Sequence, residues 1–248
     1  MSLKPLKLVL ISTPIGFLGS GRGGGVELTL ISIVKGLLEM GHEVVVIAPE
    51  GSTLPSDCKN AELIKVKGTD QVSWQHQDSF APMSIPLDGI LPKLLEKGFE
   101  VAKHSDAILN LCYDWLPLWL TPHVEVKLFH LISMAGESKL MEQVIKNISI
   151  SHHSRLGFHT FRQASDFDLT AEPKVLGNGF DLRNYNFQLS KHGPLGWAGR
   201  VAPEKGLEDA AQLAASLGDK LLVWGFIEDK EYAAKVEASV ASGTIQWR

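Results

Sequence analysis

A strand, a glycine-rich loop, a helix and a second strand follow one another within the first fifty residues, and this order restricts the fold more than any other feature. Residues 7–13 (KLVLIST) and 43–48 (EVVVIA) are apolar runs of the kind that form buried parallel strands. The helix predicted between them, over residues 26–40, carries one apolar stripe made of Val26, Leu30, Val34 and Leu37. Parallel strands joined by a helix form a right-handed unit, so we predict an α/β fold with a doubly wound sheet.

The later segments continue this alternation. Further strands are predicted at residues 63–66, 107–111, 126–132, 148–151, 174–176, 195–198, 220–224 and 244–247. Helices are predicted at residues 86–103, 138–146, 153–163, 206–217 and 229–241. The 248 residues, 44% of them hydrophobic, suffice for one large domain or two modest ones. The polar stretch 182–194 is predicted to be a linker between a domain of residues 1–181 and a segment of residues 195–248.

Charge and cysteine content exclude several classes of protein. The net charge of -4 argues against a general nucleic-acid binder. Cys58 and Cys112 lack the paired spacing of a zinc site or a redox dithiol, which favours a reducing cytoplasm. No apolar run is long enough for a signal peptide or a membrane span, so any membrane contact is expected to be peripheral.

Two cations occupy a strand-to-helix turn in residues 195–209 (LGWAGRVAPEKGLED). The strand ends near Gly199 and the next helix starts near Gly206, so Arg200 and Lys205 lie beside the amino end of a helix. Free N–H groups and the helix dipole favour anions there, and the two cations add charge-assisted contacts to phosphate oxygens. This spacing favours a diphosphate site, although two solvated cations in an exposed loop fit it as well.

Glycines crowd the loop after the first strand. Gly19, Gly21 and Gly24 satisfy the pattern G-x-G-x-x-G, and Glu50 stands at the end of the second strand, where a ribose-binding acid would be. A dinucleotide-dependent oxidoreductase is therefore an alternative. Against it, residues 14–18 separate the strand from the first glycine, which should follow the strand almost directly.

Three segments, in this order, resemble the retaining GT-B glycosyltransferases of the family-4 type. GGGVELTL resembles the glycine-rich loop after the first strand, GNGFD the N-G-x-D segment before the interdomain linker, and GRVAPEKG the G-R-x-x-x-x-K-G segment that opens the donor domain. The resemblance implies two Rossmann-like, doubly wound domains, an acceptor domain at 1–181 and a donor domain from 195. The chain ends before the Glu-x7-Glu segment of relatives, which implies an incomplete second domain and little transferase activity in these 248 residues alone.

The resemblance also implies site residues on the donor side. Arg200 and Lys205 correspond to cations that hold the diphosphate of a nucleotide sugar, and Gly23 and Gly24 to a backbone that approaches its sugar and phosphate. Glu27, in the first turn of the helix, becomes a catalytic candidate that could hydrogen-bond an acceptor hydroxyl. Its alternative role is that of an acidic residue favouring the helix start.

The acceptor side has three candidates. His130 stands near the end of the strand at 126–132, and a lone histidine among apolar residues is most often a packed, hydrogen-bonded core residue. The resemblance instead implies a catalytic histidine in the interdomain cleft that positions and polarises a sugar hydroxyl. Tyr113 and Asp114 follow the strand at 107–111, where ligands bind in open α/β sheets, so they are acceptor-side candidates.

The predicted function is transfer of a hexose from a nucleotide diphosphate sugar to a hydroxyl-bearing small molecule or glycan, with retention. YDWLPLWLTP and HLISM resemble bacterial pteridine glucosyltransferases, which implies UDP-glucose as donor. Family chemistry implies no metal and no cofactor. A nucleotide-sugar epimerase of the same architecture and a binding module without catalysis are the alternatives.

Overall fold

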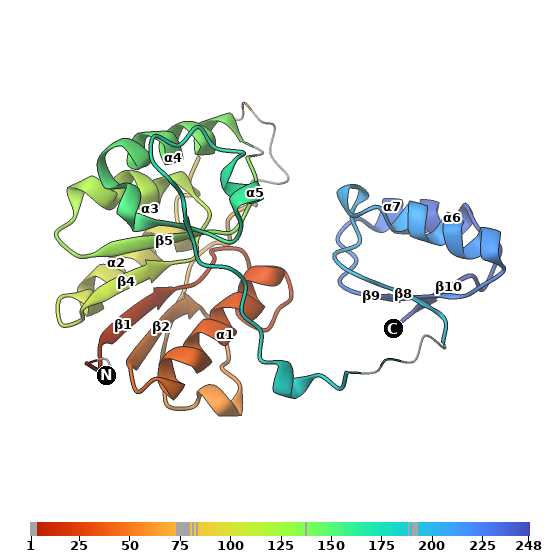
Figure 1. Ribbon diagram of the computed structural model, residues 1–248, viewed down its shortest axis with the longest axis horizontal. Helices are drawn as coiled ribbons and strands as arrows, with labels where there is room; N and C mark the ends of the chain where they lie inside the picture. Colours follow the sequence, from red (N-terminus) through yellow and green to blue (C-terminus); the bar gives the residue numbers. More distant parts are fainter. Residues whose placement is uncertain are drawn as a thin grey trace. The chain divides into compact units, whose positions relative to one another are not determined.

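Seven parallel strands form one sheet in the computed structural model, which describes residues 4–72, 80, 82, 84–136, 138–187, 189 and 193–248 (Figure 1). From edge to edge they are β3 (Glu62–Val66), β2 (Glu43–Pro49), β1 (Lys7–Ile11), β4 (Ala107–Asn110), β5 (Leu128–Ile132), β6 (Leu156–Phe158) and β7 (Lys174–Val175). From the centre of the sheet, β1, β2 and β3 follow one another toward one edge, and β4, β5, β6 and β7 follow one another toward the opposite edge. The predicted doubly wound α/β sheet is therefore confirmed, with its switch point between β1 and β4.

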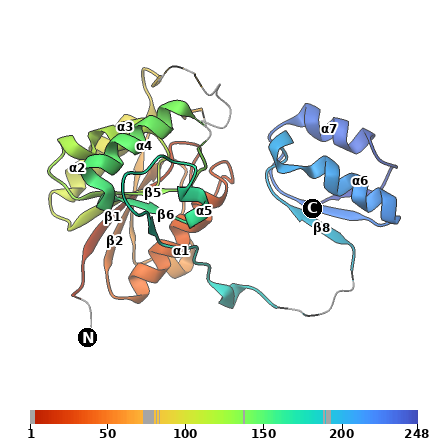
Figure 2. The same ribbon diagram turned by 45° about the horizontal axis from the view of Figure 1, so that its top comes forward.

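Helices cover both faces of this sheet (Figures 1 and 2). α1 (Gly25–Glu39) packs on one face, in the core that contains Leu10. α2 (Ile90–Ala102) packs on the other, in the core that contains Val9 and Ile11. Alternate residues of β1 thus enter opposite cores, because successive side chains of a strand point to opposite faces. This explains why the first strand is apolar from Leu8 to Ile11.

The prediction for residues 138–163 is wrong in part. α4 (Lys139–His152) continues through residues 148–151, which were predicted as a strand, and β6 lies where a helix was predicted. The buried apolar residues of α4 have helical spacing: Met141, Ile145 and Ile148. The four residues ISIS alternate like a strand only when they are considered alone, since a window of four cannot reveal a helical period. α3 (Trp115–Leu120) packs against α4, and α5 (Phe161–Ala164) follows β6.

A second compact unit follows the first, and the chain divides into Met1–Leu182 and Arg183–Arg248. The described part of its parallel sheet has the order β10 (Ile245–Trp247), β9 (Leu221–Trp224), β8 (Leu195–Ala198). α6 (Leu207–Leu217) and α7 (Lys230–Ala238) lie on the same face of that sheet (Figure 1). They enclose a core of their own, so each unit has a separate hydrophobic interior.

An ion-pair cluster holds the end of the first unit against α1. Lys35 Nζ lies 2.5 Å from Asp57 Oδ2 and also pairs with Asp181, and the Lys35 and Asp181 side chains are only 16% and 15% exposed. The hydrogen bonds to Asp181 and Asp57 raise the pKa of Lys35, and the bond from Lys35 lowers the pKa of Asp57. The last residues before the second unit are therefore fixed on the helix that follows the glycine loop.

Candidate functional site

The glycine-rich loop before α1 wraps around the carboxylate of Glu27, which is 8% exposed. Glu27 Oε2 accepts hydrogen bonds from the N–H of Gly19 at 2.7 Å and of Gly21 at 3.4 Å. Glu27 Oε1 accepts from the N–H of Gly23 at 2.8 Å and from the Ser20 hydroxyl at 3.2 Å. Four donors of one loop thus converge on a carboxylate in the first turn of the helix.

The remaining amides of residues 19–24 are also used inside the chain. The three bonds are Ser20 N–H to Phe17 O at 2.9 Å, Arg22 N–H to Ser20 Oγ at 3.2 Å and Gly24 N–H to Gly21 O at 3.2 Å. The N–H groups of Gly23 and Gly24 therefore both have partners inside the chain, and the approach of a donor's sugar and phosphate to this backbone stays a prediction. Both oxygens of Glu27 likewise accept hydrogen bonds from the loop, and a bond from Glu27 to an acceptor hydroxyl stays a prediction.

Side-chain contacts fix this loop in place. A Cβ on Gly23 would lie 2.9 Å from Thr13 Cγ2 and 3.0 Å from Glu27 Cγ, so the loop closes on Glu27 only with glycine there. On its exposed side, Arg22 pairs with Asp70 at 2.5 Å, which ties the loop to the segment after β3. The loop is thus a built structure whose centre is the Glu27 carboxylate.

The switch point of the sheet lies at the carboxyl ends of β1 and β4, where this loop begins. Within the described residues, four buried side-chain atoms have no hydrogen-bond partner, and each lies beyond the carboxyl end of a strand: Ser12 Oγ, Gln71 Oε1, Trp115 Nε1 and Ser133 Oγ. Such atoms are rare, because each costs about 1–3 kcal/mol. This edge is therefore a candidate ligand site. None of these four residues was predicted from the sequence. Ser12 and Ser133 are polar residues directly after apolar strands and could have been found by that signal, whereas Gln71 and Trp115 lie further along the chain from a strand.

Tyr113 and Asp114 lie at that edge but are buried. The Tyr113 hydroxyl donates to Ala135 O at 3.1 Å, and Tyr113 is 9% exposed. Asp114, 1% exposed, caps α3 by accepting from Leu116 N–H at 3.1 Å, and it also accepts from the Gln71 side chain. Both side chains are thus buried and bonded within the first unit, and their contact with an acceptor stays a prediction.

His130 lies inside the first unit and is 2% exposed. Its Nε2 is 2.7 Å from Thr121 Oγ1 and its Nδ1 is 3.1 Å from Asn110 Nδ2, so both ring nitrogens have partners. Burial, together with a smaller effect of the charge of Arg155, lowers the pKa of His130 to about 3. These are the surroundings of a neutral core histidine. The structure thus gives His130 the packed, hydrogen-bonded state that its apolar neighbours favoured, and its action on a sugar hydroxyl in the interdomain cleft stays a prediction.

The two cations of the second unit lie between β8 and α6, where the spacing predicted them. Arg200 is bound by carboxylates: its guanidinium lies 3.0 Å from Glu204 Oε1 and also pairs with Glu228, and its side chain is 13% exposed. Lys205 is exposed, and Gly206, with φ of 64°, turns the chain into α6. Of these two carboxylates, Glu228 lies 28 residues from Arg200 in the sequence, so local spacing could not predict this pair.

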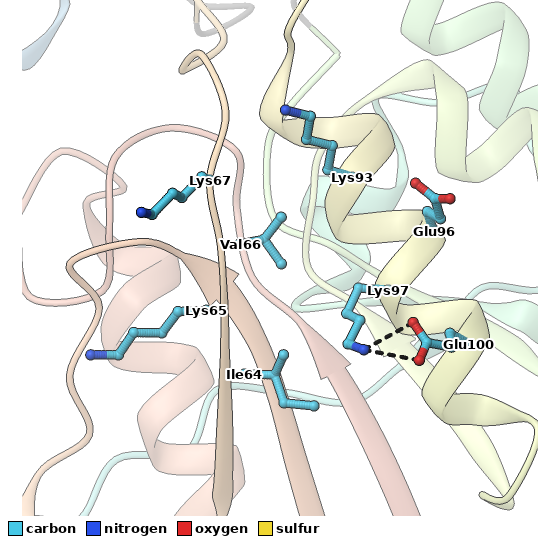
Figure 3. Close-up of a pocket in the computed structure, with 8 residues that line it drawn as sticks. All are labelled: Ile64, Lys65, Val66, Lys67, Lys93, Glu96, Lys97 and Glu100. Carbon is cyan, nitrogen blue, oxygen red and sulfur yellow. Dashed lines mark hydrogen bonds and ion pairs between the residues drawn. The ribbon is translucent and has the colours of Figure 1, made fainter.

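A groove of about 410 Å³ lies elsewhere, along the edge strand β3 and α2 (Figure 3). It is lined by Ile64, Lys65, Val66, Lys67, Lys93, Glu96, Lys97 and Glu100. Figure 3 shows Lys65 and Lys67 pointing away from α2, while Lys97 pairs with Glu100 on the helix itself. None of the candidate site residues lines this groove.

The described residues were also compared with the requirements of a metal site and of a membrane-spanning helix. They contain no group of three or more His, Cys, Asp or Glu side chains placed to hold a metal ion. In addition, none of the helices built from them is long and apolar enough to cross a membrane.

Neither a family model nor a curated protein matches the chain. Among solved structures, the crystal structure of AviGT4, a glycosyltransferase involved in avilamycin A biosynthesis, matches with a TM-score of 0.62 and 19% identity. The match covers 98% of this chain. The chain has the fold of a GT-B glycosyltransferase.

Other solved structures match at lower TM-scores. The glycotransferase of kitacinnamycin matches at 0.49 with 12% identity, over 99% of this chain and 71% of that chain. MurG of Acinetobacter baumannii matches at 0.43 with 10% identity, over 99% and 67%. The chain spans 63% of the length of AviGT4, and at 19% identity that likeness establishes the fold and not the activity.

Proposed function

We propose that the chain acts in glycosyl transfer, moving a hexose from a nucleoside diphosphate sugar to a hydroxyl-bearing acceptor with retention of configuration, as a family-4 type enzyme. The observation that carries this proposal is the position of Arg200 at the turn between β8 and α6, in a chain with the fold of AviGT4 over 98% of its length. UDP-glucose is the favoured donor because of the pteridine glucosyltransferase resemblance. No observation favours the epimerase or the binding module.

On the donor side, Arg200 and Lys205 neutralise the diphosphate leaving group. Charge developing on the departing phosphate is stabilised best by cations and helix amino ends that are already in place. A guanidinium carries five N–H donors, so Arg200 can bind carboxylates and phosphate oxygens together. In this proposal the reaction requires neither a metal nor a cofactor, and it takes place in the cytoplasm.

On the acceptor side, residues beyond the carboxyl ends of β1, β3, β4 and β5 supply hydroxyl-binding groups. Ser12, Gln71, Trp115 and Ser133 each keep a buried polar atom without a partner in the described chain. Hydroxyl groups of a small molecule or glycan can donate to and accept from such atoms. Asp114 and Tyr113 act as positioning residues that hold this edge in shape.

Calorimetric titration of UDP into wild type, Arg200→Ala and Lys235→Ala tests the donor site. The loss of Arg200 is expected to weaken UDP binding by about 1.5–3 kcal/mol, roughly 10- to 150-fold, the range for hydrogen bonds to charged groups. Lys235 is an exposed cation of the same unit and serves as the control. Equal UDP affinity in all three proteins would mean that Arg200 is only a surface cation. In a separate thermal-shift measurement, stabilisation of the protein by NAD alone would favour the oxidoreductase.

A further inference from the structure

We infer that Glu27 is a positioning residue that fills an anion nest in the glycine loop, so that the loop receives a neutral, hydroxyl-bearing part of a ligand and leaves the diphosphate to the second unit. The last clause rests on the proposed function. The assignment of Glu27 itself rests only on hydrogen bonds inside the first unit.

Four hydrogen-bond donors of the loop converge on Glu27. Backbone N–H groups of a turn that converge on one point form a nest, which binds anions such as phosphate. Here the N–H groups of Gly19, Gly21 and Gly23 converge on one carboxylate, at 2.7, 3.4 and 2.8 Å. A carboxylate has about four acceptor positions, and the Ser20 hydroxyl takes the fourth. The nest is therefore full, and its anion is part of the chain.

The charge of Glu27 at the start of α1 opposes the binding of a second anion there. Glu27 lies in the first turn of α1, where the helix dipole and unpaired N–H groups favour one negative charge. Its carboxylate already supplies that charge. A phosphate brought to the same place would face a buried like charge in a region of low dielectric, where repulsion is weakly screened. The helix start that resembles a phosphate site in sequence thus disfavours phosphate in the folded protein.

The outer side of the loop, away from Glu27, carries no side chain at Gly21 and Gly24. Gly21 and Gly24 have φ of 75° and 59°, and a Cβ on either would meet no described atom within 4 Å. The backbone is therefore open to a ligand on the side away from Glu27. With its amides turned inward and no side chain at these positions, this surface suits close approach of an uncharged group such as a sugar or acceptor hydroxyl.

Chemical rescue tests the nest. Glu27→Ala removes the internal anion and is expected to lower the melting temperature by about 5 °C or more, because several charge-assisted hydrogen bonds are lost. Sodium acetate, which restores a carboxylate, is expected to raise the melting temperature of this variant more than that of wild type, and acetamide is not. Glu27→Gln, which turns an NH₂ group toward N–H donors, is expected to lose stability as well. Glu39→Ala, which removes an exposed carboxylate of the same helix, is the control.

Equal effects of acetate on Glu27→Ala, Glu39→Ala and wild type would overturn the assignment. So would a Glu27→Gln protein as stable as wild type, because a packing role alone needs no charge. These readouts do not depend on turnover or on the donor.

Amide NMR of wild type with sodium pyrophosphate tests the choice of ligand. The loop signals of Gly19, Gly21 and Gly23 are expected to stay in place, and their movement at low millimolar pyrophosphate would overturn the neutral-ligand assignment. Movement of the Val201 and Ala202 signals reports on the proposed donor site. If these two signals do not move, the result counts against the proposed function. The assignment of Glu27 to the nest is then unaffected, because the acetate experiment tests it independently.

Discussion

At the residue scale, the hydrogen bonds of His130 determine its protonation. Asn110 Nδ2 can only donate, so His130 Nδ1 accepts from it and Nε2–H donates to Thr121. The Thr121 hydroxyl in turn donates to Pro117 O at 3.1 Å. A second proton on the ring would break the contact with Asn110. The network therefore requires the neutral imidazole, in agreement with the pKa of about 3.

This network predicts acid sensitivity. Because the folded pKa of about 3 lies below the ordinary value of 6.5, the unfolded chain binds the extra proton first as pH falls. The contribution of His130 to the free energy of unfolding is fully present above pH 6.5 and is lost toward pH 3, with a slope of at most about 1.4 kcal/mol per pH unit. Urea unfolding of wild type between pH 7 and pH 4 measures it.

His130→Gln is the variant for this test, and His153→Gln, which alters an exposed histidine, is the control. The first substitution should lower stability at pH 7 by about 2–3 kcal/mol and flatten the pH dependence, since a buried polar network loses a partner. If both variants titrate like wild type, His130 does not stay neutral in the folded state.

Glu204 is expected to oppose donor binding. Its carboxylate lies 3.0 Å from Arg200, is 48% exposed, and competes with phosphate for the guanidinium. Glu204→Gln should tighten UDP binding by a few fold, about 0.5–1 kcal/mol, with a smaller gain at high salt because exposed charges are screened. Calorimetry at two salt concentrations, with the exposed Glu237→Gln as control, measures the effect. Weaker binding would mean that Glu204 orients Arg200 for its ligand.

At the element scale, two glycines allow the backbone segments directly after β8 and β9 to lie in close contact. Gly199 N–H donates to Trp224 O at 3.0 Å, and Val201 N–H donates to Phe226 O at 2.9 Å. Between these bonds, Gly225 has φ of 145°, and a Cβ there would lie 1.7 Å from Gly199 O. This close approach of two backbones places Arg200 directly beyond the sheet.

Gly225→Ala is therefore expected to unfold or severely destabilise the second unit, by more than about 3 kcal/mol, since neither the φ value nor the backbone clash can be relieved by a rotamer change. Gly218→Ala is the matched control. Gly218 also has positive φ, 69°, but open space around it, so the cost should be about 1 kcal/mol. Circular dichroism melts of both variants measure the difference, and equal melting temperatures would contradict the close approach.

At the scale of the whole molecule, the separate cores predict two unfolding transitions. The first unit holds three hydrophobic clusters and the second holds its own. Units with separate cores lose their packing independently, so calorimetry should show two endotherms. Gly225→Ala should remove or shift only the endotherm of the second unit. One endotherm that shifts as a whole would show that the units unfold together.

Local pattern was sufficient for the α/β class, for most strands, and for the place of Arg200 and Lys205 between a strand and a helix. Hydrophobic period and glycine turns act over a few residues, so they are legible in the sequence. The pattern misled at residues 148–151, where a short window showed a strand inside α4.

The partners of the site residues were decided only by tertiary structure. Arg200 meets Glu228, 28 residues away, and His130 meets Asn110, 20 residues away. Even Glu27, whose donors are close in sequence, acquires its role from positive-φ turns at Gly19 and Gly21 that direct their amides inward. A sequence pattern records residue types at local spacing, whereas hydrogen-bond direction and burial depend on which distant segments the folded chain brings together. For this reason the sequence predicted which residues could bind an anion, whereas the fold decided which partners these residues have inside the chain.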